Sequence, residues 1–474
     1  MKDQFIHREN ENKSKIMQLL PYVVFIFALL CFVFISCPHR PGAVITGDPV
    51  FSYAPAIDAE FVCDWHSALY LQECILLKKI LNFCSLGLTG IEILYVVWYL
   101  SAFVIVLLTC VMLFSFRKEM KMPLMLYAAA LLLLMNMRGA ISFLCIDFHF
   151  VAVIVSVLFV MWRAKRTNRK KMQYLWMVAF LLLLIQMVEV RKNAALLLPF
   201  LFAVELYIFY PRFSKKCLTL LAVAFSAIFL FSEKYVSEKL FVDQKTYPAS
   251  VMMMSDLCLA ATLRGDSETT HAMLIRETGY QLKKKTRYYR ADIPYFPSFP
   301  VNEYDSSHWE PLKKIYFDAW INEFVSMFDA RMLQVVQFYT GGYIPEFVIK
   351  YYDFRYGVGN DIRSNLPAAF NYKRYFSMLV WLIVAVVSIL YTYYLTRKIV
   401  NKRATYVDTC VWVSSVVGIL YAASFLVVTP TPDFRYRVVC LLLFSLTSSV
   451  AFVKLLEKHL LKRRERNLNQ IKLN

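Results

Sequence analysis

Long runs of apolar residues are the feature that most limits what this chain can fold into. A helix of roughly 17 to 25 apolar residues crosses about 30 Å of hydrocarbon. Runs near this length lie at 17–36, 91–116, 123–137, 148–162, 172–190, 194–210, 217–232, 375–396, 406–428 and 438–456. Hydrophobic residues make up 59% of the sequence and charged residues only 18%. The sequence therefore predicts an all-α polytopic membrane protein with about ten transmembrane helices.

Basic residues predict how these helices are oriented, because Lys and Arg collect in short cytoplasmic loops. If the spans alternate, one side receives the leader, 117–121, 163–171, 211–216, 397–403 and 462–466. Both termini are then expected in the cytoplasm. We keep 17–36 as a span, since it is too long for a simple signal peptide and has no small-residue cleavage site. The net charge of +19 thus predicts topology and attraction to anionic membrane lipids, not nucleic-acid binding.

The spans divide the chain into three expected parts. These are an N-terminal transmembrane module at 1–232 with a first outer loop at 37–90, an extracytoplasmic segment at 233–373, and C-terminal transmembrane helices with a basic cytoplasmic tail at 374–474. Within the extracytoplasmic segment, 247–263 is expected to be a buried helix. The proline-punctuated stretch 296–311 is expected to be irregular.

Common catalytic motifs are absent from the sequence. There is no Walker loop, GxSxG, HExxH or dinucleotide glycine fingerprint, and the chain has only 12 glycines. We also find no inverted repeat and no matching pair of glycine- or proline-broken spans, which many transporters have. The chemistry is therefore expected at the outer ends of the spans.

Polar residues do gather at those predicted outer ends. They are Asp48, Arg138, Asp147, Glu189, Arg191, Asn193, Asp433, Arg435 and Arg437. Ionisable groups near hydrocarbon are costly, so they tend to pair or to serve a site. Pairing with a neighbour, such as Glu189 with Arg191, would explain any one of them. The set as a whole predicts a polar pocket above the bundle.

The first outer loop carries a resemblance to a known family. It reads PGAVITGDPVFSY at 41–53 and CDWHSALYLQECILLKKI at 63–80. This resembles the first outer loop of bacterial membrane glycosyltransferases of the GT-C type, which are similar to oligosaccharyl- and mannosyltransferases. RKN at 191–193, AWINEFVSMFDARM at 319–332 and DFRYR at 433–437 resemble further family segments. Ser67 stands where the family commonly has proline.

The resemblance implies a GT-C-like fold in the bacterial inner membrane and an inverting glycosyltransferase. Its donor would be a polyprenyl-phosphate-linked sugar and its acceptor a glycan or lipid of the cell envelope. The implied catalytic residues are Asp48, Asp64 and His66, and the implied substrate-binding residues are Arg138, Arg191, Asn193, Arg435, Tyr436 and Arg437.

This chemistry needs a base for the acceptor hydroxyl and donors for the departing phosphate, to which a guanidinium offers a planar fork. The cofactor stays open: several family members use a divalent metal cation, but no set of ligands at a readable spacing declares one.

Alternatives remain for the residues and for the function. Asp64 is equally expected to be the N-cap of a juxtamembrane helix at 69–81, and His66 to cap that helix. A polysaccharide repeat-unit polymerase would share the topology and a large late outer loop with paired arginines. A lipid or solute transporter would need polar groups deep in the spans, where Glu205 is the clear acid. The strong cluster after the first span favours the transferase.

Overall fold

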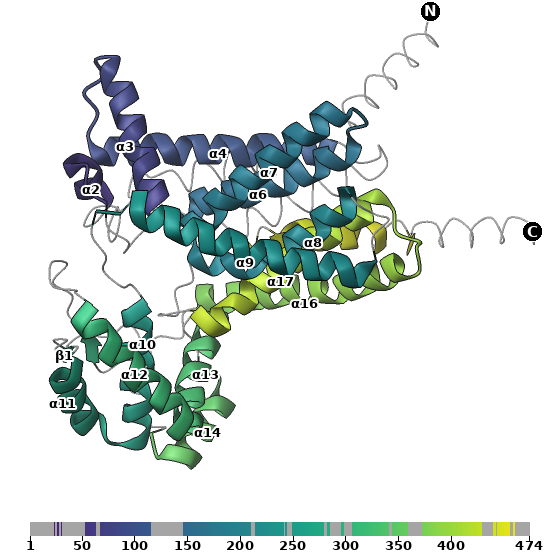
Figure 1. Cartoon of the computed structure of the whole chain (residues 1–474). Coiled ribbons are helices and arrows are strands. Elements are labelled where there is room, and N and C mark those ends of the chain that lie inside the picture. Colours follow the sequence, from purple (N-terminus) through teal and green to yellow (C-terminus); the bar gives the residue numbers. More distant parts are fainter. Residues whose placement is uncertain are drawn as a thin grey trace, which may run out of the picture.

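The chain folds into a bundle of long helices with a smaller group of helices beside one end of it (Figure 1). The computed structural model describes residues 53–62, 67–114, 146–209, 214–240, 242–243, 249–278, 282–284, 295–297, 306–340, 344–358, 372–428 and 439–455 without 442, together with residues 23, 26, 27, 30, 458 and 459.

The bundle has the composition of a helical membrane protein. It contains α4 (Gly90–Phe114), α6 (Ile146–Arg166), α7 (Lys170–Val190), α8 (Leu198–Phe209), α9 (Lys215–Leu240), α16 (Tyr372–Val400) and α17 (Tyr406–Val428). All of these except α8 include a segment long and apolar enough to cross a membrane, which gives six candidate spans in the described part of the chain. The predicted class of helical membrane protein is supported, while the predicted number of ten spans is not confirmed.

The other four predicted spans are not established. Residues 123–137 and nearly all of 17–36 lie outside the described part, and Val439–Leu455 is a shorter apolar helix. The predicted span 194–210 is not a single α-helix in the structure, for a reason that lies in its own sequence. It begins within a 3₁₀ helix, η2 (Lys192–Leu197), and only 12 residues of α8 follow. Pro199 stands in the first turn of α8, where a missing N–H is tolerated, but it prevents the α-helix from extending backwards.

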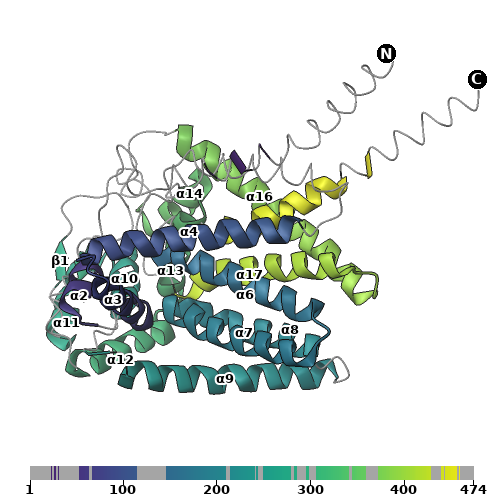
Figure 2. The same cartoon turned by 90° about the horizontal axis from the view of Figure 1, so that it is seen from above.

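The first outer loop contains two short helices, α2 (Ala54–Ala59) and α3 (Ala68–Phe83). The predicted helix at 69–81 is confirmed as α3, but its N-cap is Ser67, whose hydroxyl accepts from the backbone N–H of Tyr70 at 3.2 Å. The proposed capping role of Asp64 is therefore wrong. The α3 helix lies across the direction of α4 in Figures 1 and 2.

The described residues between 249 and 358 form what we call the helical unit. It contains α10 (Ala249–Arg264), α11 (Ser267–Thr278), strands β1 (Leu282–Lys284) and β2 (Tyr295–Pro297), α12 (Ser306–Asn322), α13 (Phe324–Thr340) and α14 (Glu346–Tyr356). The strands pair antiparallel, with Leu282 opposite Pro297. The unit has its own hydrophobic core, in which α10 is buried as predicted for 247–263. The stretch 296–311, predicted to be irregular, instead contains part of β2 and the start of α12.

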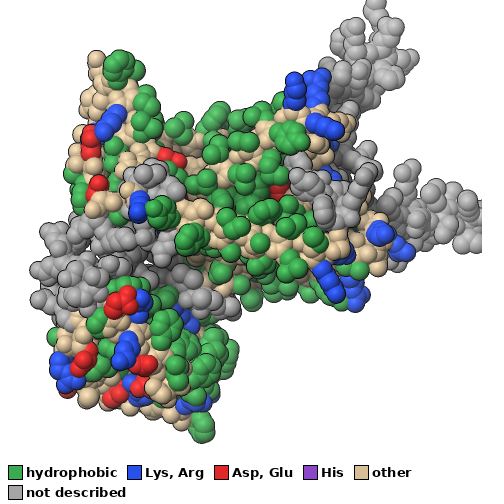
Figure 3. All heavy atoms as spheres, viewed as in Figure 1, with side chains coloured by type: hydrophobic (Ala, Val, Ile, Leu, Met, Phe, Trp, Pro, Cys, Tyr) green, Lys and Arg blue, Asp and Glu red, His purple; other side chains and the backbone are tan. Residues whose placement is uncertain are grey.

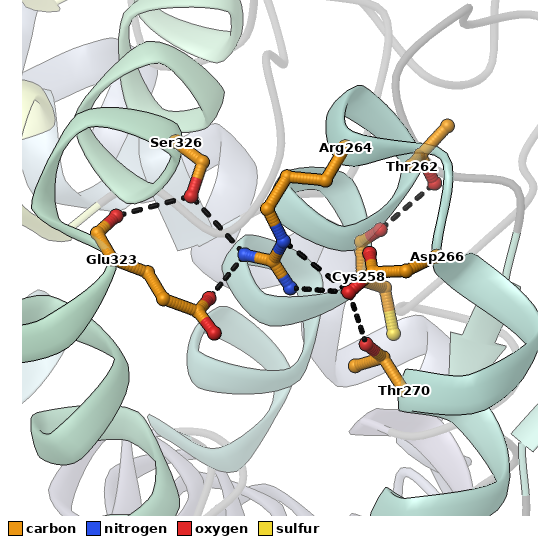
Figure 4. A network of polar contacts seen from close by, with 7 residues as sticks. All are labelled: Cys258, Thr262, Arg264, Asp266, Thr270, Glu323 and Ser326. Carbon is orange, nitrogen blue, oxygen red and sulfur yellow. Dashed lines mark hydrogen bonds and ion pairs between the residues drawn. The ribbon is translucent and has the colours of Figure 1, made fainter.

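The segment 319–332 resembles one amphipathic helix in sequence, but it is divided between α12 and α13 at Glu323. Figure 4 shows the contacts at this break. Arg264 at the end of α10 pairs with Glu323, donates to Ser326 Oγ at 3.1 Å and donates to Asp266 Oδ2 at 3.0 Å. Ser326 Oγ in turn donates to the carbonyl of Glu323 at 3.0 Å. One guanidinium thus joins the ends of α10, α11 and α13.

The two ends of the bundle differ in character. Helix ends and turns at one end, which we call the basic end, carry Arg163, Lys165, Arg166, Lys170, Lys171, Lys215, Lys216, Arg397, Lys398, Lys402 and Arg403. Figure 3 shows such side chains gathered on the right. The opposite end, the loop end, carries α2, α3 and the helical unit. There Val62 N–H donates to Asp243 Oδ2 at 2.7 Å, and Asp243 N–H donates to the Val62 carbonyl at 2.8 Å. These bonds attach the first outer loop to the chain that enters the helical unit.

Candidate functional site

The structure describes two of the predicted site residues, Arg191 and Asn193. The predicted catalytic residues Asp48, Asp64 and His66 lie outside the described part of the chain. The same holds for Arg138, Arg435, Tyr436 and Arg437. The candidate site therefore consists of described side chains at the loop end.

The turn at Arg191 and Asn193 is fixed at the loop end. Arg191 ends α7 in an extended conformation and donates its backbone N–H to the carbonyl of Met187 at 3.2 Å. Asn193 Nδ2 donates to Ser424 Oγ on α17 at 2.9 Å. The predicted segment 433–437 begins a few residues after the end of α17. The bond between Asn193 and Ser424 therefore joins the turn after α7 to the end of α17.

A buried carboxylate lies just before this turn. Glu189 is buried in the last turn of α7, and its Oε1 accepts from Lys192 Nζ at 3.0 Å. No described residue donates a hydrogen bond to its Oε2. Because an oxygen of a buried carboxylate is costly to leave without a donor, Glu189 is a group that a bound substrate could satisfy.

A polar cluster that was not predicted from the sequence lies between four helices at the loop end. We call it the Glu73 cluster: Glu73 on α3, Ser101 on α4, His149 on α6 and Gln186 on α7. Gln186 Nε2 donates to both oxygens of Glu73 at 3.2 Å and lies 3.3 Å from His149 Nε2. Ser101 Oγ lies 3.0 Å from His149 Nδ1. His149 Nε2 is 4.0 Å from Glu73 Oε2.

Glu73 is the member of the cluster that reaches the surface. Its side chain is 39% exposed, while that of His149 is 17% exposed. Partial burial raises the pKa of the Glu73 carboxyl, and the hydrogen bond from Gln186 opposes this shift. Burial also raises the pKa of the neighbouring Cys74 thiol to about 12, which keeps it protonated and a poor nucleophile. An acid of raised pKa beside an imidazole can accept a proton from a bound hydroxyl.

The members of the cluster are far apart in sequence, so no motif connects them. His149 and Gln186 each stand inside an apolar run. Polar residues within a span are a known signal of a site or pathway. A search of the predicted spans for uncharged polar side chains as well as acids would have identified His149 and Gln186. Only the fold brings Glu73 to them.

Few side chains in the Glu73 cluster could bind a metal ion. The described part of the chain contains no group of three or more His, Cys, Asp or Glu side chains that could hold a metal ion. Glu73 and His149 offer one carboxylate and one imidazole, fewer ligands than a Mg²⁺ or Ca²⁺ site takes from oxygen donors.

No family model, no curated protein and no solved structure matches this chain. The resemblance of the short segments in the first outer loop and near the last spans therefore stays a prediction.

Proposed function

We propose that this protein is a membrane glycosyltransferase acting at the loop end. It moves a sugar from a polyprenyl-phosphate-linked donor to a glycan or lipid acceptor of the cell envelope, with inversion. The observation that carries the proposal is the Glu73 cluster, in which a half-exposed carboxylate lies beside His149 within the bundle. Transfer to a hydroxyl requires such a proton acceptor.

The surroundings of the cluster fit a donor that arrives through the membrane. Leu76, Ile80 and Phe83 follow one another along one stripe of α3, and all three are exposed. A helix with such a stripe rests at the boundary between headgroups and acyl chains. A lipid-linked sugar moving in the membrane would meet α3 and then Glu73 on the same helix.

Positively charged side chains supply the second requirement of the reaction, which is to hold the departing phosphate. Arg191 is half-buried at the loop end near the buried Glu189. In the proposal, Arg191 and the arginines 435 and 437 hold the phosphate of the donor, because a guanidinium binds phosphate with two parallel donors. Asp48 and Glu73 are the two candidate bases, and Asp64 and His66 orient the acceptor.

The proposed orientation places the loop end outside the cytoplasm of a bacterial inner membrane, with ten GT-C-like spans and both termini inside. The gathering of Lys and Arg at the basic end supports this choice. Single cysteines introduced at Lys284 and Asn168 test it with an impermeant thiol reagent. The reagent is expected to reach position 284 in intact cells. Labelling at position 168 but not at position 284 would show that the orientation is the opposite of the proposed one.

The activity is tested with Glu73→Gln and Asp48→Asn, and with Glu60→Gln as the matched control. Glu60 lies in the same loop but forms an exposed ion pair with Lys79. Removing the base is expected to lower sugar transfer per folded enzyme by about 10²-fold or more. The wild-type pH profile should contain a limb that Glu73→Gln removes if Glu73 is the base. Near-normal transfer in both variants would contradict the proposal.

A transporter is the second candidate, and Glu205 favours it. Glu205 lies in α8 and is 1% exposed, and no described residue donates to either carboxylate oxygen. Such a group inside a bundle is typical of a proton or ion pathway. A transporter would lose flux in Glu205→Gln, whereas a glycosyltransferase of the proposed kind would keep its transfer activity. If the protein were a repeat-unit polymerase, its loss would instead alter the distribution of polymer lengths.

A further inference from the structure

We propose that the helical unit rests on the lipid bilayer through one face formed by α12, α13 and α14. The partner is the headgroup and upper acyl region of the membrane that holds the bundle. This inference does not depend on the proposed function.

The face is large and mostly aromatic. Its exposed members are Phe317, Ile321, Phe324, Val325, Phe328, Phe347, Tyr351 and Phe354, and we call it the aromatic face. Phe354 is 94% exposed, Ile321 77% and Phe347 74%. Contiguous exposed apolar surface of this kind is rare on a domain surrounded by water, and it marks an interaction site.

The sequence spacing places these residues together on each helix. Phe347, Tyr351 and Phe354 follow one another at intervals of four and three, so they share one side of α14. Phe324 and Phe328 share one side of α13, with ring centroids 5.9 Å apart and nearly parallel planes. Trp320 of α12 contacts Phe324 with ring centroids 5.9 Å apart, which continues the face across the break between α12 and α13.

A polar network behind the face holds α13 and α14 in register. Asp329 on α13 accepts from the hydroxyls of Tyr351 at 3.2 Å and Tyr356 at 2.7 Å, both on α14. Arg355 pairs with the same carboxylate at 3.1 Å. Tyr352 donates to the backbone carbonyl of Asp329 at 2.6 Å. The rings are therefore presented by a fixed surface, which lowers the entropy lost when that surface binds.

Two observations identify lipid as the partner. First, α13 packs against α17, so the face adjoins a bundle whose own outer surface is apolar. Figure 3 shows hydrophobic side chains on the edge of the helical unit that is turned toward the basic end, over α13 and α14. Second, exposed Lys350 lies on the same stripe of α14 as Phe347 and Phe354. Aromatic rings mixed with Lys are characteristic of the membrane interface, where Lys reaches phosphate.

The test places the photoreactive residue benzoylphenylalanine at Phe347 or Phe354 in the full chain. The protein is reconstituted in vesicles of phosphatidylethanolamine and phosphatidylglycerol, irradiated, and analysed by mass spectrometry for covalent lipid. Ile275 on α11 is the matched control, because it is also an exposed apolar residue of the unit but not of the aromatic face. Leu390 on α16, exposed within a candidate span, shows that lipid adducts form.

We expect lipid adducts at 347 and 354 that exceed those at 275 by at least about tenfold, since burying a phenylalanine side chain favours the apolar phase by roughly this factor or more. Adducts at 390 without adducts at 347 and 354 would overturn the proposal. A crosslink from 347 or 354 to a second copy of the chain would also overturn it and would assign the face to a dimer. Both substitutions replace exposed aromatic rings with a larger aromatic ring, so folding is retained.

Discussion

The membrane bundle and the helical unit bury their polar groups in different ways. In the helical unit, buried charges are held by partners from neighbouring helices. Asp256 on α10 pairs with Arg331 at 2.9 Å and accepts from Tyr316 at 2.8 Å and Gln334 at 3.2 Å. In the bundle, buried hydroxyls turn back to their own helix, as Ser226 does to the carbonyl of Ala222 at 2.7 Å. A hydroxyl in hydrocarbon has no water to bind, so the nearest backbone carbonyl serves.

This difference indicates which polar contacts in the bundle stabilise the fold and which could serve a functional site. Contacts between its helices that involve ionisable side chains occur at its two ends, while Ser388 Oγ joins two helices by donating to the Phe444 carbonyl at 2.9 Å. At the basic end, Asp408 is fully buried and pairs with Lys398 and Lys454, which ties α17 to α16 and to the last described helix. At the loop end, the Glu73 cluster remains open to the surface. A closed network is expected to stabilise the fold, whereas an open one is available to a substrate.

The largest expected effect on stability comes from opening the closed network of the helical unit. Burial raises the pKa of Asp256 to about 6, and Arg331 is the main group that opposes this shift. Arg331→Leu leaves a buried carboxyl without its cation and is expected to cost about 3–5 kcal/mol of unfolding free energy. Arg276→Leu, which removes only an exposed ion pair with Glu277, should cost at most about 1 kcal/mol. Equal losses in denaturant unfolding would show that the network is not structural.

A smaller effect of opposite sign is expected in the bundle. Glu205 is buried, and no described residue donates to its carboxylate, so Glu205→Leu should raise the free energy of unfolding by about 1–3 kcal/mol. Asp408→Leu is the contrasting variant, because it leaves Lys398 and Lys454 without their acid and should destabilise the bundle. Thermal unfolding in detergent measures both. A loss of stability in Glu205→Leu would mean that this carboxylate has a partner the described residues do not include.

The smallest effect concerns the start of α3. Ser67→Ala removes the acceptor for the Tyr70 N–H and is expected to cost about 1 kcal/mol. Ser67→Asp keeps an acceptor and should restore most of the loss. Hydrogen exchange of the first amides of α3 reports the local change. If neither substitution alters that exchange, packing rather than the cap determines where α3 begins.

Much of the fold was predictable because hydrophobic runs determine where long helices form. The sequence located α3 and α10 for the same reason. It did not locate the start of α8 near Pro199 or the break at Glu323, because these depend on one proline and on a contact from Arg264, more than fifty residues away. The Glu73 cluster depends on the packing of four helices, which no local pattern contains.

The central claim is that the loop end transfers a lipid-linked sugar. The most direct measurement compares surface glycans and lipid-linked sugars by mass spectrometry in cells with the protein, without it, and with Asp48→Asn or Glu73→Gln at equal protein level. We predict that the glycan loses one sugar residue and that the lipid-linked precursor accumulates when the protein is absent or its base is removed. Unchanged glycans and unchanged lipid-linked sugars in cells without the protein would contradict the account.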